Sequence, residues 1–187
     1  MSPEIKNKTS ATRMNARRIV RATPSTFGSL CLVLVVLASP TPSLADSKTG
    51  ESYPRIWLNP GFFSLHFDRT RDLREDNIGL GAEIVLHRNH ALIGGTFINS
   101  ERERTRYAAY QWRPLHWKAG DTTRVVAGVV IAALDGYPRV RDGDWFVAPL
   151  PLLAIESRRI GFNFSVVPTI NDRVDGAVIA QIKVRVW

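Results

Sequence analysis

The sequence predicts an all-β protein, an eight-stranded antiparallel up-and-down β-barrel that follows a cleaved N-terminal signal peptide. Apolar residues alternate with small or polar ones over short segments, and polar turn residues separate these segments. No segment shows a convincing helical period. Because side chains of a strand point alternately to its two faces, this alternation gives each strand an apolar face and a small or polar face.

The first 45 residues have the three parts of an export signal. A basic region precedes an apolar run at 27–38 that is too short to span a membrane as a helix. Ser43-Leu44-Ala45 then supplies a small-x-small cleavage site before Asp46. The alternative is a membrane anchor that stays attached. We therefore expect a signal peptide at 1–45, a flexible polar segment at 46–54 and the barrel domain at 55–187.

Eight segments of the barrel domain have strand character. The first is bent at Asn59-Pro60-Gly61, and the sixth contains Pro149 and Pro151, so it cannot be a regular central strand throughout. The expected strands cover 55–68, 78–86, 91–98, 107–113, 123–133, 145–156, 160–168 and 176–187. A four-residue turn at 87–90 joins the second and third strands, and 115–122 is expected to be a connection.

The second strand has the clearest division into faces. Ile78, Leu80 and Ile84 fall on one face, whereas Gly79 and Glu83 fall on the other. Glu83 and Glu156 both lie on the less apolar faces of their strands. We expect them to face the lumen of the barrel and to pair there with Lys183 or Arg185 from the last strand.

Charge and cysteine content exclude several function classes. The whole chain has a net charge of +8, but residues 46–187 hold 19 basic and 16 acidic residues, a net charge of +3. Bulk charge therefore gives no argument for nucleic-acid binding. The single cysteine lies in the signal, which excludes a disulfide, a thiolate metal site or a cysteine nucleophile in the barrel. His87 and His90 lack further ligands nearby, so we expect no metal and no cofactor.

The length of the strands agrees with a barrel in the bacterial outer membrane. Transmembrane strands need about 9–11 residues, and eight is the smallest common strand number. Aromatic residues near strand ends fit the girdles of such barrels. These residues are Trp57, Tyr107, Tyr110, Trp112, Trp117, Tyr137 and Trp145. We expect a monomer that contacts membrane lipids; the alternative is a soluble barrel of the lipocalin type in the periplasm.

A pattern around the sixth and seventh strands resembles a known family. Trp145, followed after three residues by Pro149-Leu150-Pro151 and later by the run 164–168 (FSVVP), is similar to the lipid A palmitoyltransferase (PagP-like) family of small outer-membrane acyltransferases. The strand before Trp112-Arg113-Pro114 and the terminal aromatic residue are also similar. The resemblance implies that Pro149 and Pro151 loosen the wall and give an acyl chain access to the lumen.

The resemblance also implies where catalysis would occur. The family uses a His, an Asp and a Ser at the outer rim, and its Asp-Ser pair falls on Asn99-Ser100 here. The family's His position falls near Phe62, with His66 close by. Independently, alternation of loops along the barrel brings His66, Asp68 and Ser100 to one rim, where a His can activate a hydroxyl for acyl transfer. The alternative is an ordinary rim histidine and a turn serine.

The same alternation gathers nine arginines at that rim. They are Arg69, Arg71, Arg74, Arg102, Arg104, Arg106, Arg139, Arg141 and Arg173. Arg102, Arg104, Arg139 and Arg141 are the candidates for binding lipid phosphate, including that of lipopolysaccharide, because guanidinium groups pair bidentately with phosphate. The alternative is loop charge balanced by neighbouring carboxylates. The leading functional expectation is a barrel that binds acyl chains and transfers one to lipid A. The alternative is a non-catalytic envelope barrel in the outer membrane or the periplasm.

Overall fold

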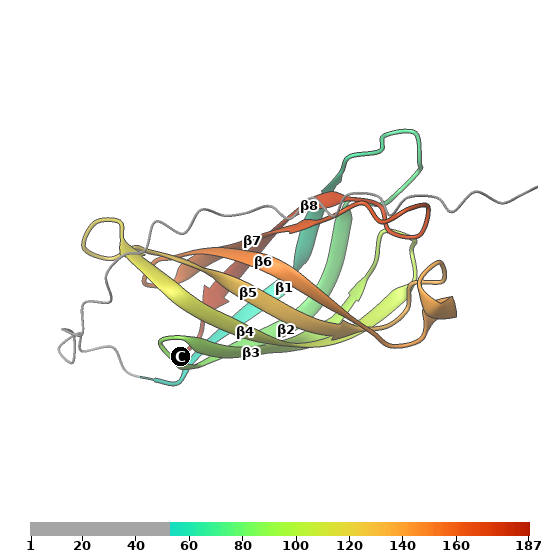
Figure 1. Cartoon of the computed structure of the whole chain (residues 1–187). Helices are drawn as coiled ribbons and strands as arrows, with labels where there is room; N and C mark the ends of the chain where they lie inside the picture. The colour runs from blue at the N-terminus through green and yellow to red at the C-terminus, as the bar shows by residue number, and fades with distance from the viewer. Residues whose placement is uncertain (1–52) are drawn as a thin grey trace, which may run out of the picture. The chain divides into compact units, whose positions relative to one another are not determined.

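The computed structural model describes residues 53–187, which form a closed antiparallel barrel of eight strands. The strands follow one another around the wall, and β1 pairs with β8 to close it (Figure 1). The strands are β1 (Arg55–His66), β2 (Asp76–His87), β3 (His90–Ile98), β4 (Arg104–Lys118), β5 (Arg124–Leu134), β6 (Phe146–Glu156), β7 (Ile160–Val167) and β8 (Ala177–Arg185). The predicted fold class is therefore confirmed for this part of the chain.

The predicted signal peptide (1–45) and most of the predicted flexible segment (46–54) lie outside the described residues. Tyr53, near the end of that segment, packs against a core cluster of Trp57, Val85 and Ala91. A second core cluster joins β5 and β6 through Val126, Leu152 and Ala154. Within residues 53–187, no helix has both the length and the apolar character needed to cross a membrane.

Several predicted element boundaries were wrong, and the largest difference is in β4. The strand predicted over 107–113 runs from Arg104 to Lys118, and the connection predicted at 115–122 is correspondingly shorter. Pro114 does not end β4 because the register against β5 shifts between Trp112 and Leu115, and such an irregularity accepts a residue without an N–H. The predicted four-residue turn at 87–90 is tighter, since His87 pairs with His90 across the hairpin.

The bend predicted in β1 is present. The register against β2 shifts between Asn59 and Gly61, and Gly61 has a φ of 104°, which favours glycine. A Cβ added at Gly61 would lie 2.0 Å from the backbone oxygen of Asn77, so no other residue fits there without movement of β2.

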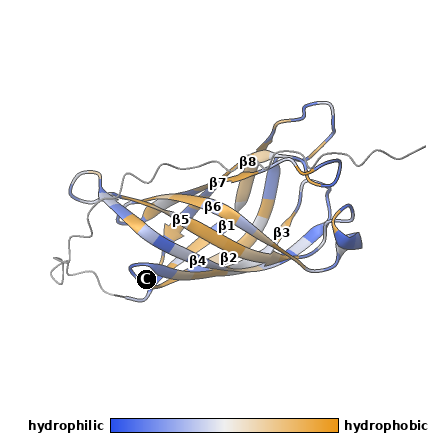
Figure 2. Cartoon of the chain, viewed as in Figure 1, coloured by the Kyte–Doolittle hydropathy of each residue, from blue (hydrophilic) through white to orange (hydrophobic). Residues whose placement is uncertain are grey.

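The alternation of β2 follows the prediction. Ile78 and Leu80 are 61% and 67% exposed on the outer wall, whereas Glu83 is fully buried in the lumen. Colouring by hydropathy shows apolar residues along the strands and polar residues gathered in the connections (Figure 2). The barrel therefore has an apolar outer wall and a lumen that contains charged groups.

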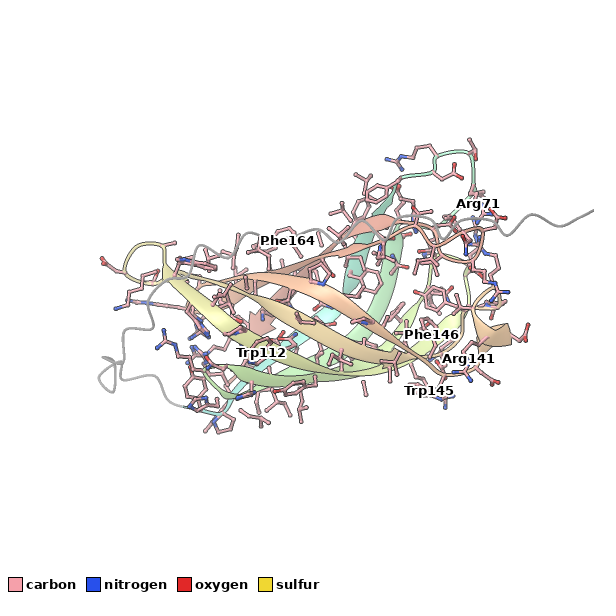
Figure 3. The ribbon with its side chains drawn as sticks, in the orientation of Figure 1. Arg71, Trp112, Arg141, Trp145, Phe146 and Phe164 are labelled. Carbon is pink, nitrogen blue, oxygen red and sulfur yellow. The ribbon has the colours of Figure 1, made fainter. Side chains whose placement is uncertain are left out.

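The connections fall into two groups at opposite ends of the barrel. Long loops at 67–75, 99–103, 135–145 and 168–176 share one end, called the loop end here; Arg71 and Arg141 lie there in Figure 3. The third of these loops contains a 3-10 turn, η1 (Arg141–Gly143). Connections at 88–89, 119–123 and 157–159 share the other end, the turn end, where Ile56 N donates to Trp187 O. The predicted gathering of His66, Asp68 and Ser100 at one end is thus present.

The predicted grouping of aromatic residues was partly wrong. Trp57 is buried in the lumen, and Tyr107 and Tyr137 line an internal cavity rather than the outer wall. Tyr107 points inward because it alternates with outward residues on β4. Of the predicted group, Tyr110, Trp112, Trp117 and Trp145 are exposed.

Candidate functional site

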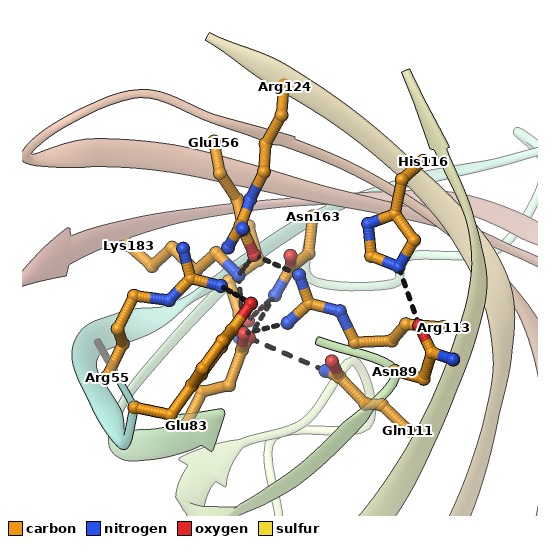
Figure 4. A network of polar contacts seen from close by, with 12 residues as sticks. Arg55, Glu83, Asn89, Gln111, Arg113, His116, Arg124, Glu156, Asn163 and Lys183 are labelled. Atoms are coloured by element: carbon orange, nitrogen blue, oxygen red, sulfur yellow. Dashed lines mark hydrogen bonds and ion pairs between the residues drawn. The ribbon is translucent and has the colours of Figure 1, made fainter. Parts of the chain in front are cut away.

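The turn-end half of the lumen holds a buried charge network. Its members are Arg55, Glu83, Arg113, Arg124, Glu156 and Lys183, on six different strands (Figure 4). Lys183 Nζ donates to Glu83 Oε1 at 2.6 Å and to Glu156 Oε1 at 2.8 Å. Arg113 bonds the same two carboxylates, at 3.2 Å to Glu83 and 2.7 Å to Glu156. The predicted lumen pairing of the two glutamates with Lys183 is confirmed.

The network also departs from the expectation. Arg113 and Arg124 pair with Glu156, whereas the sequence predicted Arg185 as a possible partner. Arg113 shares its face of β4 with Gln111, and this parity is the signal by which it could have been found. Gly161 leaves space for Lys183, because a Cβ added at this glycine would lie 2.9 Å from the Lys183 Cε. The ammonium of Lys183 also lies 5.0 Å from the centre of the Trp57 ring, a cation–π contact.

The loop-end half of the lumen contains a cavity of about 520 Å³ with mostly apolar walls. Its lining includes Phe62, Phe97, Val130, Leu150 and Ile179. The ring of Phe62 packs edge-on against Phe97, with 4.7 Å between ring centres. A cavity of this size is within the roughly 300–1,000 Å³ that small-molecule sites occupy.

Amide side chains separate the cavity from the charge network. Gln111, Asn163 and Gln181 line the cavity. Asn163 Nδ2 donates to Glu83 at 2.9 Å and to Gln181 at 3.1 Å, and Gln111 donates to Glu83 at 3.5 Å. Gln111 and Asn163 thus bond the Glu83 carboxylate on one side and face the cavity on the other. The cavity therefore has a polar floor, and residues of the four long loops line it at the loop end.

The wall beside the cavity lacks a regular ladder between β6 and β7. β6 pairs with β5 along its whole length, but with β7 only from Leu153↔Phe164 to Glu156↔Gly161. Ser157 N donates to Ile160 O, so the N–H of residue 157 points toward β7. Alternate residues of a strand direct their N–H groups to the same neighbour, so positions 155, 153, 151 and 149 of β6 also face β7. Pro149 and Pro151 occupy two of these positions and have no N–H to donate.

The interruption reaches the cavity. Val147 and Pro149 on β6 line it, as do Ser165 and Pro168 on the other side of the seam. One side-chain bond crosses the interruption, from Ser165 Oγ to Pro151 O at 2.8 Å. The irregularity expected from the two prolines is thus confined to one edge of β6 and lies next to apolar internal space.

The predicted catalytic residues are not all at the cavity. His66 and Ser100 are both buried and both line it. Ser100 Oγ donates to Asn77 Oδ1 at 3.4 Å, while His66 Nδ1 is buried without a hydrogen-bond partner. Asp68 is exposed outside the cavity lining, where Thr70 Oγ1 and Thr70 N donate to its carboxylate at 2.7 and 2.9 Å. Both bonds lower the pKa of Asp68, and the bond from the Thr70 hydroxyl has the larger effect.

Asn99, which stands at the position of the family's Asp, organises the 99–103 loop. Its amide donates to Gly136 O at 2.6 Å and Thr105 Oγ1 at 3.1 Å. Its carbonyl oxygen accepts from the backbone N–H groups of Glu101 and Glu103. An ionised aspartate has no donor for the first two bonds, so this arrangement requires the amide.

The predicted phosphate-binding arginines have different environments. Arg139 lines the cavity and bonds Glu101 and Asp175. Arg102 pairs with Asp72 at 2.9 Å on the exposed surface, and Arg104 is exposed at the start of β4. Arg141 lies in η1. Two further arginines of the predicted rim set, Arg71 and Arg173, lie at the mouth, on loops whose proximity depends on closure of the barrel.

The candidate site therefore consists of an apolar cavity, an adjacent seam without a ladder, and charged groups at the mouth. No protein-family model matches the chain, and no curated protein is similar enough in sequence to count as a relative.

Proposed function

We propose that this chain is an outer-membrane barrel, similar to the lipid A palmitoyltransferases, that takes an acyl chain into its cavity and transfers it to lipid A. One observation carries the proposal: an apolar cavity of about 520 Å³ adjoins a stretch of wall that has no ladder between β6 and β7. An alkyl chain has no polar group to satisfy, so it suits a cavity whose walls are mostly apolar.

The outer wall supports a place in the membrane. Large apolar side chains are exposed on every strand, with Ile78, Leu80 and Val147 all more than 60% exposed. A soluble monomer rarely exposes contiguous apolar patches larger than a few hundred Å². Exposed Trp112, Trp117 and Trp145 suit the interfaces of a bilayer. A soluble periplasmic barrel would need a polar outer wall.

The seam supports lateral access from the bilayer. Strands without a ladder between them separate at a smaller cost than hydrogen-bonded strands, since no backbone bond in that stretch must break. Val147, Pro149, Ser165 and Pro168 line both the seam and the cavity. Phe164, at the last pair before the interruption, also lines the cavity and is half-buried.

In the proposed reaction, Ser100 Oγ attacks the carbonyl of a phospholipid ester and His66 accepts the serine proton. The lysophospholipid leaves as its alcohol with that proton, and the acyl group stays on Ser100. A hydroxyl of lipid A then attacks the acyl-serine and gives its proton through His66 back to Ser100 Oγ. This sequence needs no cofactor, and it uses the two predicted residues that line the cavity.

A second candidate is a barrel that binds acyl chains without transferring them. The position of Asp68 favours it, since its carboxylate bonds Thr70 and leaves His66 Nδ1 without a partner. A histidine without an orienting carboxylate is a weaker base catalyst.

Mass spectrometry of lipid A from cells that express or lack the protein distinguishes the candidates. We expect an added acyl chain with the natural protein and none with Ser100→Ala. Ser157→Ala, in a turn at the opposite end, is the matched control and should leave the added chain. An unmodified lipid A, with the protein in the outer-membrane fraction, would reject transfer and leave the binding function.

A second measurement tests the route. Pro149→Val with Pro151→Val restores two N–H donors directed at β7, so the ladder can extend along the seam. We expect slower uptake of a fluorescent fatty acid by the double variant, with unchanged uptake in the control Pro54→Ala, which lies before β1. Equal rates for all three proteins would place the access route elsewhere.

A further inference from the structure

A chain of ion pairs joins the four long loops at the mouth of the cavity. Arg71 Nη1, on the first loop, donates to both carboxylate oxygens of Asp175 on the fourth loop, at 2.8 and 3.0 Å. Arg139, on the third loop, bonds the same carboxylate. Arg139 Nε also donates to Glu101 on the second loop at 2.9 Å. One carboxylate, Asp175, is therefore shared by two guanidinium groups.

This mouth cluster (Arg71, Glu101, Arg139, Asp175) borders the apolar cavity. Glu101, Arg139 and Asp175 line it, and Arg173 adds another positive charge to the lining. The side chains of Arg71 and Arg139 are 36% and 32% exposed, so solvent and ligands reach them. A ligand whose tail fills the cavity would place its head group among these residues.

The charges at the mouth suit an oxyanion. Each guanidinium has five N–H donors, and a single carboxylate shared by two of them leaves donors available. Burial, and after it the nearby Asp175 carboxylate, raises the pKa of Glu101. A phosphate group presents more oxygens than a carboxylate and pairs bidentately with arginine.

We propose that Asp175 occupies the place of a phosphate, and that the phosphate of an amphiphile displaces it from Arg71 and Arg139 when the tail enters the cavity. The inference rests on the proposed function, because it requires an acyl chain in the cavity. It adds a head-group site for that chain and selects Arg71 and Arg139 from the arginines that the sequence places at this rim. It also implies that Asp175 weakens ligand binding, since its carboxylate competes with the phosphate for the two arginines.

The test compares probes that share a twelve-carbon tail. The full mature barrel is held in a nonionic amphipol, so that no detergent tail competes for the cavity. Binding of dodecyl phosphate, dodecanoate and dodecanol is measured by displacement of a fluorescent fatty acid, and binding of inorganic phosphate by ³¹P NMR. We expect dodecyl phosphate to bind about tenfold tighter than dodecanol, the effect of one charge-assisted contact, and inorganic phosphate to bind far more weakly than either.

The variants separate the head group from the tail. Arg71→Gln and Arg139→Gln should remove the preference for dodecyl phosphate and leave dodecanol binding unchanged. Asp175→Asn should tighten dodecyl phosphate several-fold, because the competing carboxylate is gone. Arg158→Gln is the matched control, since Arg158 is exposed in the 157–159 connection at the turn end and should retain the preference.

Each outcome has a distinct meaning. Equal binding of dodecyl phosphate and dodecanol would overturn the head-group site while leaving the acyl cavity intact. Dodecanoate binding as tightly as dodecyl phosphate would assign the site to carboxylates and overturn the phosphate. Inorganic phosphate binding as tightly as dodecyl phosphate would make it a site for a free anion. Failure of every tailed probe to bind would reject the proposed acyl cavity itself.

Discussion

The barrel has a cluster of ion pairs at each end, and the two differ in burial. In the charge network at the turn end, Glu83, Arg113, Glu156 and Lys183 have side chains that are at most 1% exposed. In the mouth cluster, Arg71 and Arg139 are about one-third exposed. Buried pairs cannot exchange partners with solvent or ligands, whereas pairs with a partly exposed member can. The same side-chain chemistry therefore fixes the structure at one end and offers an exchangeable site at the other.

The largest effect should come from removing a carboxylate of the buried network. Four cations, Arg55, Arg113, Arg124 and Lys183, surround only two carboxylates. Glu156→Gln removes the charge that three of them share, so we expect the free energy of unfolding to fall by about 3–5 kcal/mol. Guanidinium unfolding of the barrel in micelles measures it, with the exposed Glu103→Gln as control. A loss below that of the control would mean that water reaches the network.

A smaller loss is expected when a cation is removed from the same network. Lys183→Met deletes two bonds to carboxylates but leaves Arg113 bound to both glutamates. Because cations outnumber carboxylates, we expect a loss of about 2 kcal/mol, less than for Glu156→Gln. The same unfolding measurement compares them. The reverse order would show that the ammonium, and its contact with Trp57, matters more than the charge balance.

The sequence predicts the buried cluster better than the mouth cluster, for a physical reason. Alternation within a strand places Glu83, Glu156 and Lys183 in the lumen, because each lies on a regular strand. Arg113 was missed because Pro114 follows it and suggests the end of a strand. The contacts of Asp175 depend on how loops distant in sequence meet after the barrel closes. The local sequence pattern contains no information on these contacts between loops.

The orientation of the Asp68 side chain also could not be predicted from the pattern of residue types. Parity brings Asp68 to the same end as His66 and Ser100, as predicted. Its carboxylate nevertheless bonds Thr70 two residues later, a local turn contact that competes with any contact across the rim. The catalytic roles of Asp68, His66 and Ser100 all stay predictions; His66 and Ser100 line the cavity, whereas Asp68 does not.

At the mouth cluster, removal of a carboxylate should cost little stability. Asp175→Asn breaks pairs with Arg71 and Arg139, but both arginines are partly hydrated, so we expect a loss of no more than about 1 kcal/mol. In 1 M salt, where the screening length is about 3 Å, this difference should shrink, whereas the loss in Glu156→Gln should persist. Equal salt sensitivity of the two variants would remove the distinction between the clusters.

The smallest effect concerns Asp68, which is fully exposed beside the mouth cluster. The Thr70 hydroxyl lowers the pKa of Asp68, so Thr70→Val should raise that pKa toward its ordinary value, while the bond from Thr70 N remains. A lowered carboxyl pKa adds stability above the unfolded pKa that is lost as the pH falls through the folded pKa. The variant should therefore be slightly less stable than the natural protein at neutral pH, and this difference should disappear in acid. ¹³C NMR titration of the carboxyl carbon measures the shift, with Thr169→Val, on the fourth loop, as control. If the Asp68 pKa does not move in Thr70→Val, another group holds the carboxylate. A shift on replacing His66 by Gln would then make Asp68 the partner of that histidine and restore the complete catalytic set.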